Sequence, residues 1–148
     1  YGLPKPLSGV IDKNIGRSKI NRLKMAIMRT GGRTAITNYA VKEIYFDGLL
    51  SMIECKLDTG RTHQIRVHLA SVGHSIIGDT TYGNRKKSLA GVDAKIKTLV
   101  NDFPRQALHS YKIGFIHPVS GEEMEFEVGL PEDIRNLKGA LQKGALQS

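Results

Sequence analysis

Alternation of apolar and polar residues gives the strongest strand signals in the first half of the chain. Residues 34–46 are rich in Thr, Ile, Val and Tyr, and a second alternating run covers residues 49–57. Asp47-Gly48 separates the two runs, and an Asp-Gly pair is a favoured hairpin turn because both residues tolerate a positive φ. We therefore expect an antiparallel hairpin here. A weaker alternation at residues 8–16 predicts another strand, and residues 24–28 form a further short apolar run.

The period of the pattern changes to that of a helix after Gly60. Apolar residues then recur at intervals of four and three positions, as on one face of an α-helix. The positions concerned are Ile65, Leu69 and Val72. Thr62 is the expected N-cap residue. Gly73 is expected to end the helix, because glycine readily adopts the left-handed conformation of a C-terminal stop.

A second hairpin is expected in the last third of the chain. Its strands are residues 107–116 and 123–128, and the connection between them, His117–Gly121, contains proline and glycine. In the second strand three apolar residues alternate with three glutamates, so one face should be hydrated and acidic.

Two more helices complete the predicted elements. One covers residues 92–100, and another starts at Pro131, since proline suits the first turn of a helix. The inward residues of the first should be Val92, Ile96 and Leu99. Residues 139–148 contain little to bury and are expected to fray. Together the elements predict an α+β fold, a mostly antiparallel mixed sheet with hairpins and one central helix, in a single partial domain over residues 1–148.

The composition is that of an ordinary globular domain. Of the 148 residues 40% are hydrophobic and 24% charged, and no apolar run approaches the roughly 20 residues of a membrane span. The sequence begins with Tyr1-Gly2 rather than an initiator methionine, which we interpret as a fragment or a processed product. Cys55 is the single cysteine, so no internal disulfide forms, and we expect a structural thiol in a reducing cytoplasm.

The charges are unevenly distributed along the chain. The net charge is +8, with Lys and Arg concentrated in residues 13–33 and 85–87 and the acids in residues 121–133. Segregated charge of this kind favours a polyanionic partner such as a nucleic acid. The alternative is a basic surface that serves only solubility.

The segment from Leu57 to His68 carries the most informative polar pattern. A strand ends, glycine makes a turn, and a helix starts, where free N–H groups suit phosphate or carboxylate. Arg66 lies at the border of the apolar stripe, so its guanidinium should be partly buried and need a carboxylate. No acid stands three or four residues away in the helix, so the partner must come from elsewhere, unless the side chain simply extends to water.

The two histidines of this segment do not predict a metal site. His63 and His68 are five residues apart and do not share a helix face, and no Cys, Asp or Glu of the helix completes a ligand set. We interpret His63 as a hydrogen-bonding or RNA-facing side chain and His68 as structural.

Three segments of the chain contain distinctive motifs. The most specific is Gly60–His68, with the sequence GRTHQIRVH, followed by Gly73-His74 and by IGDTTYG at residues 77–83. The others are GRTAITNY at residues 32–39, and RQALHS at residues 105–110 with FIHP at 115–118. In this order they resemble the motifs of RNA pseudouridine synthases of the RluA/RluC type, and the resemblance runs from about residue 2 to residue 134.

The resemblance implies an isomerase that converts uridine to pseudouridine without a cofactor, in ribosomal RNA, above all that of the large subunit, or in transfer RNA. In this family a catalytic aspartate attacks the flipped-out nucleotide, and the base detaches, rotates and rejoins through carbon. Arg66 matches the arginine that pairs with that aspartate, and Leu108 matches an apolar residue that packs near the target base. The residues expected at the RNA are Arg61, His63, Lys24, Arg33, Arg85 and Lys86.

The departure from the family pattern concerns the nucleophile. The catalytic aspartate of the family lies in a His-Arg-Leu-Asp type motif, and no segment of this sequence matches it. We therefore expect the 148 residues by themselves to be inactive, with Asp58 and Asp79, which flank the helix, as the first alternative nucleophiles to test. Two other interpretations stay open, a non-catalytic basic RNA-binding module and a ribosome-associated structural protein. A His-Arg-Leu-Asp motif encoded upstream of Tyr1 would favour the enzyme.

Overall fold

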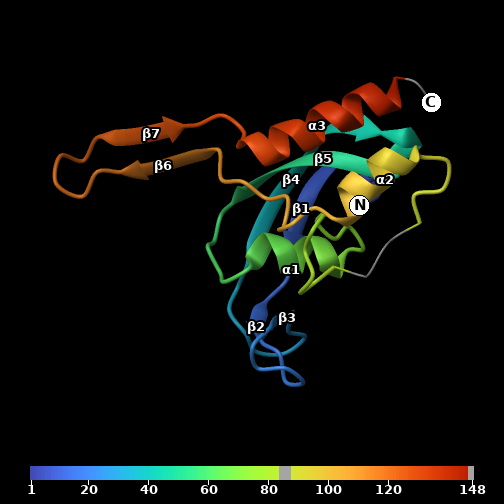
Figure 1. Ribbon diagram of the computed structural model, residues 1–148. Coiled ribbons are helices and arrows are strands. Elements are labelled where there is room, and N and C mark those ends of the chain that lie inside the picture. The colour runs from blue at the N-terminus through green and yellow to red at the C-terminus, as the bar shows by residue number, and fades with distance from the viewer. Residues whose placement is uncertain (84–87, 147–148) are drawn as a thin grey trace.

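A long antiparallel hairpin forms the centre of the fold. In the computed structural model, which describes residues 1–83 and 88–146, its strands are β4 (Ile36–Tyr45) and β5 (Leu50–Leu57). β1 (Ser8–Asp12) pairs with the other edge of β4, which gives the order β1-β4-β5 (Figure 1). The short 3-10 segment η1 (Phe46–Gly48) makes the turn, with Asp47 at φ 52° and Gly48 at φ 90°. The predicted hairpin and its Asp-Gly turn are confirmed.

Two smaller hairpins project from this centre in different directions (Figure 1). β2 (Ile15–Arg17) pairs with β3 (Met25–Ile27), so the weak strand predicted at residues 8–16 is divided between two separate sheets. β6 (Lys112–Ile116) pairs with β7 (Glu123–Glu127), so the second hairpin is confirmed, but its first strand begins at Lys112 and not at residue 107 as predicted. Its acidic face is exposed, but its apolar face is exposed as well, with Phe126 at 51%.

Helix α1 (Gln64–Ser71) lies within the range predicted for the central helix. Its end is the expected one, because Gly73 has a φ of 89° and its N–H bonds to Ala70 O at 3.1 Å, while His74 N–H bonds to Leu69 O at 2.9 Å. This pair of bonds is the Schellman arrangement of a glycine-terminated helix.

Two details of α1 differ from the prediction. Thr62 is not the N-cap residue; His63 is, and no side chain caps the helix. Val72 is 40% exposed rather than inward, whereas Val67 is 4% exposed and faces the core. The buried face is displaced because Val72 lies beyond the last helical turn.

In the helix predicted at residues 92–100, Leu99 was expected to face inward, but the next residue, Val100, does so instead. α2 (Ala94–Asn101) starts after Asp93, whose side chain accepts a hydrogen bond from Lys95 N–H at 2.8 Å. In the resulting register Leu99 is 37% exposed and Val100 is fully buried.

Helix α3 (Glu132–Ala145) corrects the expectation of a frayed tail over residues 139–148. The helix starts after Pro131 as predicted, but it continues to Ala145, with Leu141 only 4% exposed. Gln142 Nε2 donates a hydrogen bond to Glu43 Oε2 of β4 at 2.8 Å. These contacts hold the last turns of α3 against the central hairpin. Leu146 is 88% exposed, and residues 147–148 lie outside the described part of the chain.

The apolar side chains form two clusters. The larger one lies between the β4–β5 hairpin, α2 and α3, and its buried members are Tyr45, Phe46, Leu50, Leu89, Val92, Val100, Phe103, Leu137 and Leu141. The smaller one contains Ile15, Ala35 and Val67, with Met25, Ile27 and Tyr82 packed against it. The smaller cluster fixes α1 against the β2–β3 hairpin, and this contact positions the site described next. Among residues 1–83 and 88–146, no helix combines the length and the apolar character that a membrane crossing requires.

Candidate functional site

The turn that leads into α1 is fixed by Gln64, which is 2% exposed. Its Oε1 accepts hydrogen bonds from Arg61 N–H at 3.0 Å and from Thr59 Oγ1 at 2.8 Å. Its Nε2 donates to Ile36 O and to Thr37 Oγ1, each at 3.0 Å. A buried amide is stable only when its donors and acceptors have partners. Gln64 therefore ties the start of α1 to β4.

His63 occupies a left-handed conformation immediately before α1, with φ 56° and ψ 22°. Non-glycine residues adopt this region infrequently, although histidine is among the types that tolerate it. The ring turns away from the helix, and its Nδ1 lies 2.8 Å from the hydroxyl of Tyr82. The predicted hydrogen-bonding role of His63 is thus present within the chain, while contact with RNA stays a prediction.

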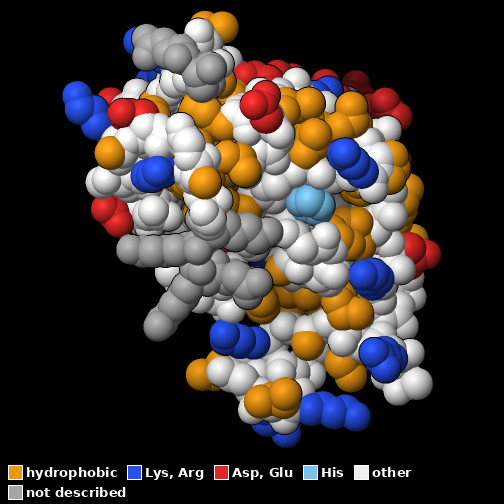
Figure 2. All heavy atoms as spheres, turned by 90° about the vertical axis from the view of Figure 1, so that its right-hand side faces the viewer, with side chains coloured by type: hydrophobic (Ala, Val, Ile, Leu, Met, Phe, Trp, Pro, Cys, Tyr) orange, Lys and Arg blue, Asp and Glu red, His pale blue; other side chains and the backbone are white. Residues whose placement is uncertain are grey.

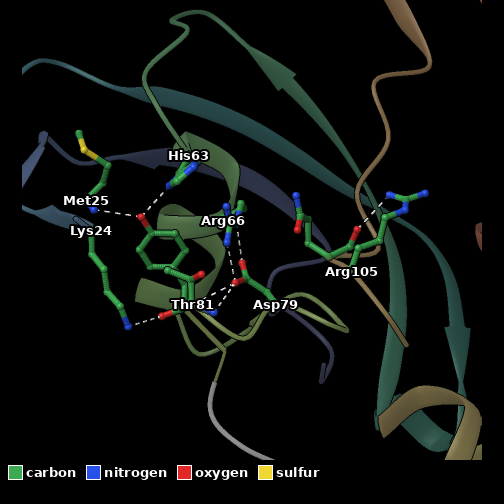
Figure 3. A network of polar contacts seen from close by, with 9 residues as sticks. Lys24, Met25, His63, Arg66, Asp79, Thr81 and Arg105 are labelled. Carbon is green, nitrogen blue, oxygen red and sulfur yellow. Dashed lines mark hydrogen bonds and ion pairs between the residues drawn. The ribbon is translucent and has the colours of Figure 1, made fainter. Parts of the chain in front are cut away.

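The side chain of Arg66 is held by a buried carboxylate (Figure 3). Nε donates to Asp79 Oδ2 at 2.8 Å and Nη2 donates to Asp79 Oδ1 at 2.9 Å. The side chains of Arg66 and Asp79 are 12% and 1% exposed. The position of Arg66 in the first turn of α1 and its partial burial are confirmed. Its partner does lie outside the helix, but this chain supplies it, and pairing with a further aspartate stays a prediction.

The environment of Asp79 keeps its carboxylate ionised. Burial would by itself raise the pKa of Asp79, because it disfavours the charged form. The hydrogen bonds from Arg66 and from the backbone N–H groups of Tyr82 and Thr81 outweigh that effect, so the pKa of this carboxyl is lowered. The hydrogen bond to Asp79 in turn raises the pKa of Arg66. Both members of the pair are charged at neutral pH.

Tyr82 completes the surroundings of the guanidinium. The guanidinium carbon of Arg66 lies 4.9 Å from the centroid of the Tyr82 ring, a distance suited to a cation–π contact. The Tyr82 hydroxyl accepts a hydrogen bond from Met25 N–H of β3 at 3.0 Å, which leaves its proton to point at His63 Nδ1. Lys24 Nζ donates to Thr81 O at 2.9 Å (Figure 3). The loop that carries Asp79 is therefore fastened to the β2–β3 hairpin.

His68 is a structural histidine on the opposite side of α1. It is fully buried, and its Nε2 lies 2.9 Å from Lys13 O, an atom that can only accept, so Nε2 carries the proton. Nδ1 then accepts from Thr37 Oγ1 at 2.9 Å. The ring is neutral and fully bonded, and burial is the first cause of its lowered pKa.

Stability should therefore depend on the protonation of His68. A histidine whose pKa is lowered in the folded state takes up its proton more readily when the chain is unfolded. The neutral His68 therefore contributes fully to the free energy of unfolding above about pH 6.5. This contribution is lost as the pH falls towards the pKa of the folded state. Urea unfolding at about pH 7.5 and about pH 5.5 measures this, since the interval spans the pKa of an unfolded histidine. We expect a smaller fall in the free energy of unfolding for His68→Leu than for the unaltered chain. Equal falls in the two proteins would contradict the neutral, buried ring.

Leu108 lines a groove to which neither Arg66 nor Asp79 contributes. Arg105 holds its loop, with two hydrogen bonds to Asp133 at 2.7 and 2.9 Å and one from Nη1 to Leu108 O at 3.2 Å. Leu108 lines an open, mainly apolar groove of about 490 Å³ together with Ile65, and Arg66 is not among the residues that line it. Leu108 therefore shares a groove with Ile65 of α1, whereas Arg66 does not line that groove. Packing of Leu108 against a base stays a prediction.

The predicted RNA-facing residues of the described chain lie around the β2–β3 hairpin and the start of α1. Arg33 is exposed and its backbone pairs with Ile15, Arg61 Nε donates to Thr34 O at 3.0 Å, and Lys24 contacts Thr81. Figure 2 shows Lys and Arg side chains together with apolar ones at the lower end of the molecule, where the hairpin lies. Ile20 is fully exposed there. Arg85 and Lys86 lie outside the described residues.

Cys55 does not supply a thiolate at neutral pH. Burial raises the pKa of the Cys55 thiol to about 11, so the thiol is protonated at neutral pH, as a structural cysteine should be. Within the part of the chain that the structure describes, no three His, Cys, Asp or Glu side chains are grouped to hold a metal ion.

The sequence alone did not indicate roles for Gln64 and Tyr82, and it indicated Asp79 only as an alternative nucleophile. The signal was nevertheless present, because Asp79 and Tyr82 belong to the Gly-Asp-Thr-Thr-Tyr-Gly segment that was matched as a motif. Two glycines show how tightly this loop is folded. A Cβ at Gly78 would lie 1.9 Å from Arg105 O, and one at Gly83 would lie 2.2 Å from Asp79 O.

Comparison with known proteins gives one consistent family. A model of the family described as RNA pseudouridylate synthase matches residues 3–71. The chain is 45% identical over 132 residues to the "Ribosomal large subunit pseudouridine synthase D" of Zymomonas mobilis, covering 88% of this chain and 39% of that protein. It is 42% identical over 143 residues to an uncharacterized RNA pseudouridine synthase of Bacillus subtilis, covering 97% of this chain and 42% of that protein.

The solved structures agree with these matches. The human RNA pseudouridylate synthase domain containing 1 superposes with a TM-score of 0.64 at 26% identity, over 95% of this chain and 62% of that one. The human domain containing 4 gives a TM-score of 0.66 at 22% identity, which supports the fold. The chain spans about two fifths of the length of the curated bacterial relatives.

Proposed function

Since the chain belongs to the RNA pseudouridylate synthase family, we propose that it forms part of an enzyme that isomerises uridine to pseudouridine in RNA. The proposed substrate is ribosomal RNA of the large subunit, in line with the names of its bacterial relatives, and transfer RNA is the second candidate. The observation that carries the proposal is the anchored guanidinium of Arg66, within the nine-residue motif of residues 60–68.

The reaction itself needs no external reactant. The bond from N1 of the base to C1′ of the ribose breaks, and a bond from C5 to C1′ forms. A proton leaves C5 and another is gained at N1, so atoms and electrons balance without a redox partner. The step does require a nucleophile close to the sugar and a means of keeping that group ionised.

Arg66 is suited to the second requirement. A guanidinium carries five N–H donors and stays protonated in proteins, so it can stabilise a carboxylate but cannot act as the nucleophile. Asp79 occupies the edge formed by Nε and Nη2. For Nη1, no acceptor is found among the described residues, so this end of the guanidinium can receive a second carboxylate. We assign that place to the catalytic aspartate of the complete enzyme.

Tritium release provides the test of this activity. RNA transcribed with uridine labelled at C5 loses its label to water when the C5 proton leaves. The complete protein should release tritium from large-subunit ribosomal RNA in proportion to the pseudouridine formed. Absence of release from both ribosomal and transfer RNA would contradict the proposed reaction.

We expect the basic stretch of residues 13–33, which includes Lys24 and Arg33, to bind RNA together with Arg61, mainly through phosphates. Each neutralised phosphate releases condensed counterions, so affinity should fall steeply as salt rises. Replacement of the exposed Arg33 by glutamine should lower the slope of log affinity against log salt by about one for each lost phosphate contact. Electrophoretic shifts with a ribosomal RNA fragment at several salt concentrations measure the slope.

Lys143→Gln is the matched control for that experiment, because Lys143 is exposed near the end of α3, away from the β2–β3 hairpin. It should leave the slope unchanged. A salt-independent affinity, or an equal change in both variants, would argue against the proposed RNA surface.

A further inference from the structure

Arg66 is fixed from two directions by one short loop, residues 77–83, here termed the aspartate loop. Asp79 binds the Nε–Nη2 edge with two hydrogen bonds of 2.8 and 2.9 Å. Its Oδ1 also accepts from Thr81 N–H at 3.0 Å and from Tyr82 N–H at 3.1 Å. Four donors in fixed directions hold the carboxylate in one orientation, and its two bonds to Nε and Nη2 orient the guanidinium in turn.

Tyr82 restricts the remaining freedom of the guanidinium plane. Its ring lies against one face of Arg66, and its hydroxyl is held by Met25 N–H and faces His63 Nδ1. The ring therefore cannot turn without breaking contacts to both β3 and the start of α1. Arg66 can neither slide along Asp79 nor tilt away from it.

The Nη1 end of Arg66 is the part of the guanidinium that Asp79 and Tyr82 leave uncovered. Asp79 occupies the Nε–Nη2 edge and Tyr82 covers one face, and among residues 1–83 and 88–146 no acceptor meets Nη1, so its donors can bind another group. Holding a charged donor in place before the reaction avoids the cost of reorienting it as charge develops.

We propose that Asp79 and Tyr82 are positioning residues for the isomerisation, which align the Nη1 end of Arg66 with the catalytic carboxylate. This inference rests on the proposed function. Neither residue touches the reacting atoms; each acts through Arg66. The loop conformation that brings them there depends on Gly78 and Gly83, where a side chain would collide with backbone oxygens at 1.9 and 2.2 Å.

Asp79→Asn in the complete enzyme tests the first residue. Asparagine keeps the shape but places an amide nitrogen where an oxygen faced a guanidinium donor, so Arg66 loses its fixed direction. We expect kcat to fall about 10²-fold, the effect of roughly 1 Å of misplacement, with the KM for RNA nearly unchanged. The acid limb of the pH profile of kcat should move to higher pH, because a misaligned Arg66 lowers the pKa of the catalytic carboxylate less.

The pH profile separates positioning from a structural role. An acid limb that stays in place or moves to lower pH would overturn the proposal for Asp79, since removing a competing carboxylate would then have left Arg66 aligned or more available. Asp102→Asn is the matched control, because Asp102 is exposed at the C-terminal end of α2 and has no part in the aspartate loop. It should leave kcat, KM and the pH profile unaltered.

Tyr82→Phe provides an independent test if Asp79→Asn does not fold. Phenylalanine keeps the ring against the guanidinium but removes the hydroxyl that bonds Met25 N–H. Without that bond the ring is less firmly held against Arg66, so we expect kcat to fall roughly fivefold, which corresponds to about 1 kcal/mol of activation free energy, without a change of KM. An unaltered kcat would remove Tyr82 from the proposal. Tritium release by the unaltered enzyme distinguishes the two failures, because its absence contradicts the function and its presence confines the failure to these residues.

Discussion

Arg66→Lys in the complete enzyme should lower kcat by about 10²- to 10³-fold, the usual cost of losing one preorganised charged donor. Lysine preserves the charge but replaces a planar fork by a single ammonium group. In the structure two of the guanidinium nitrogens are already engaged by Asp79. The ammonium group of lysine would be drawn to that buried carboxylate, and its three N–H donors, all on one nitrogen, could not also reach the position that Nη1 occupies.

Binding of RNA should be far less affected than turnover. The net charge of the site is unchanged, and Arg66 is only 12% exposed, so it offers little surface to phosphates. We expect the dissociation constant for RNA to stay within about threefold, which corresponds to well under 1 kcal/mol. Arg135→Lys on the exposed side of α3 is the control and should alter neither quantity. Near-normal kcat for Arg66→Lys would remove Arg66 from the catalytic residues.

A polypeptide limited to these 148 residues should form no pseudouridine. Asp79 cannot serve as the nucleophile, because its carboxylate is 1% exposed and accepts hydrogen bonds from Arg66, Thr81 and Tyr82. Arg66 cannot, because a guanidinium does not deprotonate. Asp58 is exposed but lies outside any segment that resembles the catalytic motif.

The measurement is incubation of the purified polypeptide with unmodified ribosomal RNA, followed by chemical labelling of pseudouridine and primer extension. Circular dichroism establishes that the polypeptide is folded under the same conditions. Site-specific pseudouridine above background would show that the nucleophile lies within this chain, and Asp58→Asn would then be the first variant to examine.

Local patterns predicted the parts of the fold that depend on nearby residues. The β4–β5 hairpin follows from alternation and an Asp-Gly turn, and the end of α1 follows from Gly73, which alone supplies the required positive φ. The length of α3 could not be predicted in this way, because Leu141 and Gln142 are held by contacts with the central hairpin almost one hundred positions earlier. The position of Leu99 was wrong because the helix starts at the Asp93 cap, which sets the register.

The candidate site was predictable to a similar extent. The place of Arg66 on a helix and its need for a carboxylate follow from spacing and from the cost of burying a charge. The identity of that carboxylate does not, since Asp79 reaches Arg66 through a loop with no regular period. Tyr82 is likewise brought to the guanidinium by packing of α1 on the β2–β3 hairpin, a contact between segments distant in sequence.

The most direct test of the account is the pseudouridine map of large-subunit ribosomal RNA from cells that lack the gene. We expect one or a few specific pseudouridines to disappear, to return when the complete gene is restored, and to stay absent when the restored gene carries Arg66→Lys. A map identical with and without the gene would contradict the assigned substrate, and restoration by the Arg66→Lys gene would contradict the role of the arginine.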